Sequence, residues 1–292
     1  MSDTSRPLVA LSFMLGATAS FTAMAVAGRE LAGKLDTFEI MTFRSMIGLA
    51  IVLMIAVVGG QLYDIRARKM KLHFIRNLCH FTGQNLWFYA VALIPFSQLF
   101  AFEFSVPLWV ALAAPFLLNE KLTRVRIAAA GIGFFGILLV ARPDTVAISP
   151  GVIAAFLCAI AFAGATIGTK ILTKTENTIS IMFWLTSLQL FFGLIGMLWD
   201  MEATLPDGES GPWVIVVGLC GLTAHYCITK AMSYAPATVV MPLDFARLPV
   251  ISVIGMIYYD EPLLWMVAIG GAIIFAANYM NIRAEQKSGK QA

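Results

Sequence analysis

The chain has 292 residues, of which 59% are hydrophobic and 13% charged, with a mean hydropathy of +0.82 and a net charge of +3. A soluble domain carries about 25% charged residues, so one water-soluble core cannot bury this much apolar surface. A disulfide-stapled secreted fold, a disordered chain and a nucleic-acid-binding protein are excluded. The composition predicts an all-α integral membrane protein whose surroundings are the lipid bilayer.

Ten apolar stretches follow one another along the chain, and most approach the roughly 20 residues that a helix needs to cross the hydrocarbon core. They cover residues 8–28, 38–59, 74–93, 96–118, 125–141, 152–172, 179–199, 213–233, 237–258 and 263–282. Connections such as 94–95 and 234–236 are so short that the flanking helices must be antiparallel. The sequence therefore predicts ten transmembrane helices and leaves no room for a soluble catalytic domain.

The basic residues are distributed unevenly between alternate connections. With the N-terminus in the cytoplasm, 15 of the 20 Lys and Arg residues fall on the cytoplasmic side and three on the other, while Arg44 and Arg247 lie within spans. Lys and Arg accumulate in cytoplasmic loops. We therefore predict a multi-pass protein of the inner (plasma) membrane with both termini cytoplasmic.

The two halves of the chain repeat at an offset of 141 residues. In this register Pro95 aligns with Pro236, and Glu103 with Asp244. The same offset also aligns Arg29 with Lys170, Gln84 with His225, and Asn119-Glu120 with Asp260-Glu261. Composition bias would align alanine with alanine, but not proline and carboxylate at one spacing.

This register predicts two repeats, residues 1–146 and residues 147–292. Each repeat holds five predicted spans, and because five is odd the second repeat must enter the membrane from the opposite side. Such inverted-topology repeats are typical of transporters, in which the solute site lies near the middle of the membrane between the repeats.

Each repeat has a proline-led fourth span that closes in an acidic corner, at residues 119–122 and 260–263, followed by a fifth span rich in glycine and alanine. In these features the sequence resembles the EamA type of the drug/metabolite transporter superfamily over nearly its whole length. The resemblance implies a central cavity built mainly by the first four helices of each repeat. The fifth helices would pack at the periphery or between subunits, so that a monomer and a homodimer both stay open. Glu103 departs from the family pattern, which usually has an apolar residue there, and this indicates a dedicated site.

Four ionisable side chains lie within predicted spans: Arg44, Glu103, Asp244 and Arg247. At this depth each costs about 2.5–3.5 kcal/mol on insertion scales, so each should face a cavity or a partner. One interpretation is two structural ion pairs, Arg44 with Glu103 between two helices, and Asp244 with Arg247 within one. The other is a solute-binding cavity. We favour the ion pair for Arg44, and the cavity for the other three.

Two prolines follow the charged positions closely, Pro107 after Glu103 and Pro249 after Arg247. A proline inside a helix frees a carbonyl group and permits a kink. We predict hinges at Pro107 and Pro249, where a carboxylate beside a breakable helix can bind a cationic group or accept a coupling proton.

The third and eighth spans carry further polar and aromatic candidates for solute binding. These are His80, Gln84, Asn85, Trp87 and Tyr89 in the third span, and His225 and Tyr226 in the eighth. For His80 an interhelical hydrogen bond is an equal alternative, whereas His225 is favoured as functional because Gln84, its mate in the repeat, is also polar. Neither histidine has a neighbour at metal-ligand spacing, and we predict no metal and no cofactor.

The leading functional prediction is a secondary transporter that moves a small polar, zwitterionic or amphipathic organic metabolite by alternating access. No Walker motif is visible, so a gradient or exchange would supply the energy, with a proton on Glu103 or Asp244 as one candidate coupling. Within the family, a riboflavin-like vitamin or S-adenosylmethionine importer and an amino-acid or drug exporter stay open.

The rival class is an intramembrane enzyme or lipid-handling protein. Such a protein would need a catalytic constellation at one membrane interface. None is found in the sequence, so we predict no enzyme.

Overall fold

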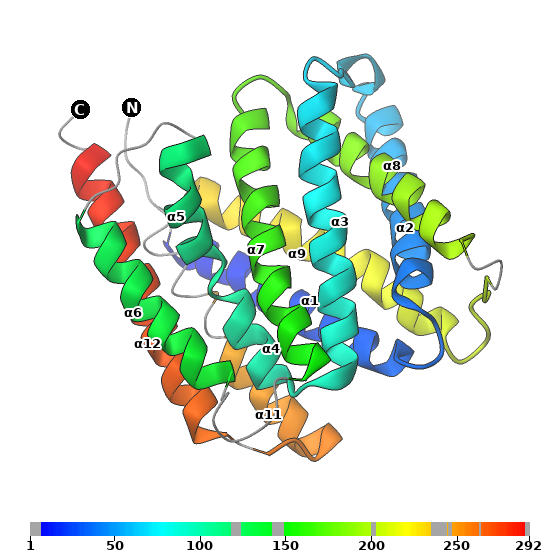
Figure 1. Cartoon of the computed structure of the whole chain (residues 1–292). Coiled ribbons are helices and arrows are strands. Elements are labelled where there is room, and N and C mark those ends of the chain that lie inside the picture. The colour runs from blue at the N-terminus through cyan, green and yellow to red at the C-terminus, as the bar shows by residue number, and fades with distance from the viewer. Residues whose placement is uncertain are drawn as a thin grey trace.

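The computed structural model describes residues 7–117, 124–141, 149–199, 203–234, 244, 247–262 and 264–289. The first half forms α1 (Pro7–Leu31), α2 (Thr37–Val58), the short 3-10 helix η1 (Leu62–Asp64), α3 (Met70–Leu93), α4 (Phe96–Glu103), α5 (Val106–Leu117) and α6 (Arg124–Ala141). The second half forms α7 (Pro150–Leu172), α8 (Thr178–Met197), α9 (Gly211–Tyr234), α11 (Arg247–Tyr259) and α12 (Trp265–Gly289). No strand occurs among these residues, which confirms the predicted all-α class (Figure 1).

Six stretches of the described chain are long and apolar enough to cross a membrane. They are Leu8–Leu31, Thr37–Val58, Phe96–Ala114, Pro150–Leu172, Thr178–Met197 and Gly211–Ile228, and shorter apolar helices cover Ile127–Ala141, Arg247–Tyr259 and Trp265–Met280. This confirms a multi-pass membrane protein, whereas the count of ten crossings and the cytoplasmic termini stay predictions. The first acidic corner at 119–122, Pro236 and the repeat boundary at 146/147 lie outside the described residues.

The helix α3 is long but is not among these stretches, because polar residues interrupt it. Its side chains His73, Arg76, Asn77, His80 and Gln84 are all buried. Burying polar side chains within the membrane costs free energy unless other helices supply hydrogen-bond or charge partners. The helix α7 packs along α3, and α1, α4 and α8 also contact it, so α3 forms a polar core of the bundle.

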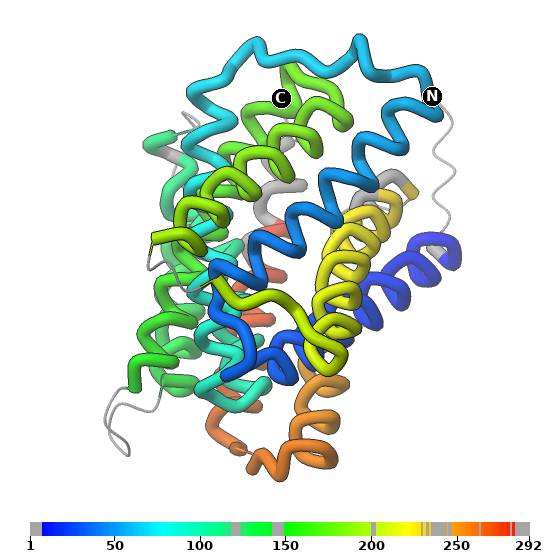
Figure 2. Tube along the Cα trace, turned by 90° about the vertical axis from the view of Figure 1, so that its right-hand side faces the viewer, coloured from blue at the N-terminus to red at the C-terminus, as the bar shows by residue number. Residues whose placement is uncertain are grey.

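The main helix contacts join the two halves of the chain. The pairs are α1 with α9, α2 with α8, α3 with α7, and α6 with α12, while α4 meets α11. Figure 1 shows α6 beside α12 at the left and α2 beside α8 at the right, and Figure 2 shows α1 beside α9. Each pair takes one helix from either half, so neither half packs as an independent bundle.

The second helix of each half begins with the same kind of cap. Asp36 accepts a hydrogen bond from the backbone N–H of Glu39 at the start of α2, at 2.8 Å. Asn177, which lies 141 positions after Asp36, accepts one from the backbone N–H of Ser180 at the start of α8, also at 2.8 Å. Such caps stabilise a helix start by about 1 kcal/mol, and here they fix where each helix begins.

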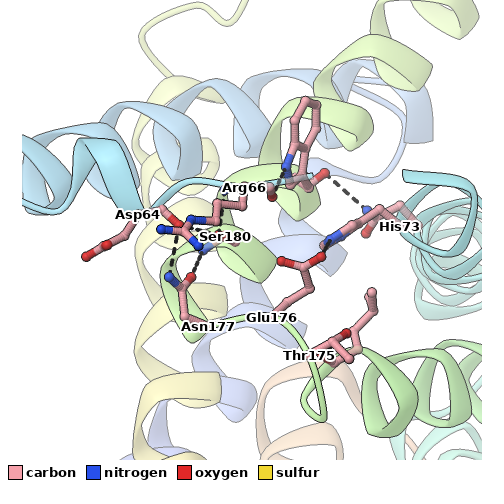
Figure 3. Close-up of polar contacts among 10 residues, drawn as sticks. Asp64, Arg66, His73, Thr175, Glu176, Asn177 and Ser180 are labelled. Carbon is pink, nitrogen blue, oxygen red and sulfur yellow. Dashed lines mark hydrogen bonds and ion pairs between the residues drawn. The ribbon is translucent and has the colours of Figure 1, made fainter. Parts of the chain in front are cut away.

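The connection between α2 and α3 is tied to the start of α8 (Figure 3). The carbonyl oxygen of Asp64 accepts hydrogen bonds from Asn177 Nδ2 at 2.9 Å and from Ser180 Oγ at 2.8 Å. The backbone N–H of Arg66 donates to Ser180 Oγ at 2.9 Å. These bonds hold a loop of the first half against a helix of the second.

The start of α3 meets the turn between α7 and α8 at the same end of the bundle. His73 Nε2 lies 4.0 Å from Glu176 Oε1, and both side chains are at most 2% exposed (Figure 3). Arg76 Nε donates to Thr169 Oγ1 of α7 at 2.9 Å. The last described turns of α12 also reach this end of the bundle (Figure 1).

The helices α6 and α12 approach each other at a pair of glycines. A Cβ atom added at Gly136 would lie 2.8 Å from the carbonyl oxygen of Gly270, and one added at Gly270 would lie 2.7 Å from that of Gly136. A Cβ atom at Gly131, on the same helix α6, would meet no heavy atom within 4 Å. Small residues permit such close helix packing in membranes.

We predict that Gly136→Ala destabilises the protein, because the backbone oxygen opposite cannot move away without separating α6 from α12. Overpacking of this kind costs about 1–3 kcal/mol. The measurement is the thermal unfolding midpoint of the purified protein in lipid nanodiscs. Gly131→Ala is the matched control and should leave the midpoint unchanged or slightly higher; equal midpoints for the two variants would contradict the packing.

Candidate solute-binding site

The fourth predicted span is broken at its charged residue. The helix α4 ends at Glu103, Phe104 and Ser105 form a turn, and α5 begins at Val106. Pro107 therefore lies in the first turn of α5, where a missing N–H costs no hydrogen bond. The fourth predicted span is thus divided into two half-helices, with the break just before Pro107, the position of the predicted hinge.

The second half presents its charges at the corresponding place. The helix α11 begins at Arg247, with Pro249 in its first turn, and Asp244 lies just before it. Glu103 and Asp244 are the repeat mates of the 141-residue register; Glu103 ends α4, and Asp244 lies three residues before Arg247, where α11 begins.

Glu103, Asp244 and Arg247 meet in one buried cluster. Arg247 Nη2 lies 3.0 Å from Glu103 Oε1 and 3.5 Å from Asp244 Oδ2. Trp87 Nε1 of α3 donates to the other carboxylate oxygen of Glu103 at 2.8 Å. The ion pair of Asp244 with Arg247, considered as the alternative to a cavity, is present. The ion pair of Arg44 with Glu103, which we favoured, is wrong, because Arg247 pairs with Glu103 and Arg44 contacts Gln84.

The guanidinium group of Arg247 is surrounded by aromatic rings. Its Cζ lies 4.4 Å from the ring centroid of Phe21, 4.9 Å from that of Phe100 and 5.1 Å from that of Phe104. Cation–π contacts stabilise a cation that has lost its water. Sequence reasoning missed Phe21, since nothing in its surroundings in α1 marks it as different from a lipid-facing phenylalanine.

The cluster leaves hydrogen-bonding atoms unused. Arg247 Nε, Arg247 Nη1 and Asp244 Oδ1 are buried, and none has a hydrogen-bond partner in the described part of the chain. A buried polar group without a partner costs about 1–3 kcal/mol. These atoms can therefore bind a polar solute at little further cost in desolvation.

Arg44 lies in a second polar region, between α2, α8 and α9 and beside α3. Its Nη1 donates to Gln84 Oε1 of α3 and to Met41 Sδ at 3.9 Å. It lines a cavity of about 20 Å³ together with Ser45, Gly48, Met182, Leu185, Thr186, Gln189, Gly218, Gly221, Leu222 and His225. Two predicted residues from different halves, Arg44 and His225, are thus brought to one cavity.

His80 and His225 lie close to this cavity. Gln189 Nε2 of α8 and His80 Nδ1 share a hydrogen bond, which is the interhelical alternative considered for His80. The ring centroids of His80 and His225 are 6.3 Å apart. Phe21 contacts the ring of His225 with centroids 5.6 Å apart, so this one side chain connects the cavity with the Arg247 cluster.

The structure does not bring three of the predicted residues into either region. Tyr89 and Tyr226 are 45% and 57% exposed, and Tyr226 contacts Phe13 of α1 with ring centroids 6.4 Å apart. Asn85 Nδ2 donates to the carbonyl oxygen of Phe81 in its own helix. Among the described residues no group of three His, Cys, Asp or Glu side chains could hold a metal ion.

An ion pair that sequence reasoning did not single out joins the last turn of α1 to the segment after α11, which lies at the end of the bundle opposite the α2–α3 connection (Figure 1). Arg29 Nη1 lies 2.9 Å from Glu261 Oε1, and Arg29 Nη2 donates to the carbonyl oxygen of Ile94 at 2.7 Å. Glu261 Oε2 accepts from the backbone N–H of Phe96 at 2.8 Å. The repeat register contained the signal, because both Arg29 and Glu261 align there with charged residues.

Comparisons with known proteins agree with this architecture. A riboflavin transporter of Brucella anthropi is 30% identical over 234 residues, which cover 78% of this chain and 82% of the relative. An S-adenosylmethionine uptake transporter of Rickettsia felis is 24% identical and covers 96% of this chain and 95% of its own length. A riboflavin transporter of Rhizobium johnstonii is 26% identical over a stretch that covers 74% of this chain and 71% of the relative.

A solved crystal structure superposes with a TM-score of 0.64 over 95% of this chain and 98% of the other, at 18% identity, which shows the fold alone. The EamA-like transporter family matches residues 8–142 and again residues 149–283. These matches and the relatives' names point to a transporter and not to an enzyme. The chain belongs to the EamA-like transporter family.

Proposed function

We propose that the chain is a secondary transporter that imports a small organic metabolite of the riboflavin or S-adenosylmethionine kind. The single observation that carries this proposal is the cluster of Glu103, Asp244 and Arg247 at the helix breaks. Import is proposed because the Rickettsia felis relative is named as an uptake transporter.

The helix breaks give the cluster its chemical use. Transporters bind solutes at discontinuous helices, because the interrupted backbone and the charged side chains there are not fully satisfied by the protein. Here two carboxylates share one guanidinium, so the cluster has one negative charge in excess. It can accept a cationic or hydrogen-donating group of the solute, and Glu103 or Asp244 is the candidate for a coupling proton.

Alternating access would follow from two inverted repeats, residues 1–146 and 147–292. The family matches begin 141 residues apart, the same offset as in the sequence register. The helix pairs support this arrangement, because exchanging the two halves turns the α1–α9 pair into the α7–α3 pair. The N-caps Asp36 of α2 and Asn177 of α8 also take each other's place when the two halves are exchanged.

We further propose ten crossings of the inner membrane with both termini cytoplasmic. The basic α2–α3 connection and the last described turns of α12 lie at one end of the bundle, in keeping with this orientation (Figure 1). The Arg29–Glu261 pair then lies at the outer end, where it would close the bundle between α1 and α11.

Reconstituted protein should take up riboflavin or S-adenosylmethionine into proteoliposomes. Glu103→Gln and Asp244→Asn should each lower the initial rate about 10- to 100-fold, which corresponds to losing a charged hydrogen bond. Uptake of each solute with and without a pH gradient measures this and tests proton coupling.

The matched control for these rates is Lys34→Gln, which removes an exposed ion pair with Glu209 at 3.2 Å and should transport at the wild-type rate. If folded wild-type protein moves neither solute under any gradient, the proposed function is wrong. If both carboxylate variants transport normally, the site is wrong.

The charge cluster also predicts non-additive stability. Arg247→Gln leaves two partly buried carboxylates without a counter-ion and should destabilise the protein by up to about 3 kcal/mol, the low end for a fully buried pair. Adding Glu103→Gln removes one of these carboxylates and should restore part of that loss, by about 0.5–3 kcal/mol. Unfolding of the two single variants and the double variant in nanodiscs measures this coupling, and strictly additive effects would contradict the ion-paired cluster.

A further inference from the structure

The cavity beside Arg44 differs in the sign of its charge from the Arg247 cluster. The cluster has one negative charge in excess, whereas the cavity is lined by the positive charge of Arg44. No carboxylate lies within ion-pair distance of Arg44 in the described part of the chain. Among the same residues only Nη1 of its guanidinium group has acceptors, Gln84 Oε1 and Met41 Sδ. Arg44 therefore keeps hydrogen-bond donors unused at membrane depth, where an uncompensated cation is costly.

A second unused donor lies next to it. Ser45 is 3% exposed and lines the same cavity, and its Oγ has no hydrogen-bond partner among the described residues. Buried hydroxyl groups normally find a partner. The described residues thus leave donors of Arg44 and Ser45 available to a hydrogen-bond acceptor of a solute.

The helix α9 makes room for the guanidinium group. A Cβ atom at Gly221 would lie 2.8 Å from Arg44 Nη2 and 3.3 Å from Arg44 Cζ, so the group lies against the backbone of α9. A larger residue at position 221 would displace it from the cavity. The position of the guanidinium is therefore built by two helices and is independent of the charges around Arg247.

The helix α3 links the two regions. Gln84 contacts Arg44, and Trp87, three residues later on the same face, contacts Glu103. Three residues of α-helix rise about 4.5 Å, so one small solute can reach both regions. An acceptor group would lie at Arg44, and a donor or cationic group toward Glu103.

We propose that Arg44 and Ser45 form the subsite that binds the hydrogen-bond-acceptor edge of the solute, a carboxylate or a cyclic imide. This inference rests on the proposed transport function. The planar fork of a guanidinium matches a carboxylate with two parallel hydrogen bonds, and it can donate one charged hydrogen bond to a carbonyl oxygen of an imide, whose own N–H is a donor. The carboxylate is the edge offered by S-adenosylmethionine, and the imide is the edge offered by the flavin ring of riboflavin.

The test is equilibrium binding of riboflavin and, separately, of S-adenosylmethionine to the purified full chain in nanodiscs. Arg44→Gln should weaken the affinity for the bound solute about 10- to 100-fold, as expected for the loss of a charged hydrogen bond. Gly221→Ala keeps the charge but displaces it, and should weaken binding by a smaller factor. Lys34→Gln is the control and should bind as the wild type does.

Solute analogues test the same contact without any change in the protein. Decarboxylated S-adenosylmethionine lacks the carboxylate, and 2-thioriboflavin replaces one imide oxygen with sulfur, a weaker acceptor. The wild-type protein should bind the analogue more weakly than it binds the parent solute. The Arg44→Gln variant should bind the analogue and the parent solute with equal affinity. This arm decides the question even if Arg44→Gln fails to fold.

The outcomes separate the subsite from the function. Suppose that the wild type binds one of the two solutes. The subsite is wrong, and the transport function stands, if the affinity of Arg44→Gln for that solute is within twofold of the wild-type affinity. The same conclusion follows if the wild type binds the analogue as tightly as the parent solute. If the wild type binds neither solute, both proposals fail.

Discussion

The arrangement of the central helices depends on one electrostatic constraint, that the charge of Arg247 must be neutralised inside the membrane. Two carboxylates do this, Glu103 at 3.0 Å and Asp244 at 3.5 Å. Glu103 comes from the end of α4 and Arg247 from the start of α11, so the ion pair joins a helix of the first half to a helix of the second. Since an unpaired charge at this depth is costly, neither half can be separated from the other at this point without losing that compensation.

The surrounding structure follows from this junction. The aromatic rings of Phe21, Phe100 and Phe104 exclude lipid and water from the guanidinium group, while Trp87 fixes the second oxygen of Glu103. The break between α4 and α5 lies at the cluster, since α4 ends at Glu103. The pairing of helices across the two halves then places α3, with its polar face, along the core. In the proposed function, a solute that competes for these contacts would change how the two halves are held together.

Sequence reasoning was strongest where it used one-dimensional patterns. Hydropathy gave the apolar spans, and the 141-residue register placed Glu103 and Asp244 at equivalent positions, where the structure has the end of one half-helix and the approach to another. It was weakest for contacts between helices. Arg44 was expected to meet Glu103 at a similar depth, but depth does not fix the direction in which a side chain points, and Arg44 turns to Gln84 instead. Tyr89 and Tyr226 failed to join the cluster for the same reason, since their helical phase directs them outward. The Arg29–Glu261 pair was missed because both residues lie in connections or helix ends that hydropathy treats as surface.

A structure of the chain in a lipid nanodisc with its transported solute bound tests the central role of this cluster most directly. We predict the solute between α3, α4 and α11, within hydrogen-bonding distance of the atoms of Arg247 and Asp244 that lack partners among the described residues. A solute bound away from these residues, with the 3.0 Å contact between Glu103 and Arg247 unchanged, would contradict it.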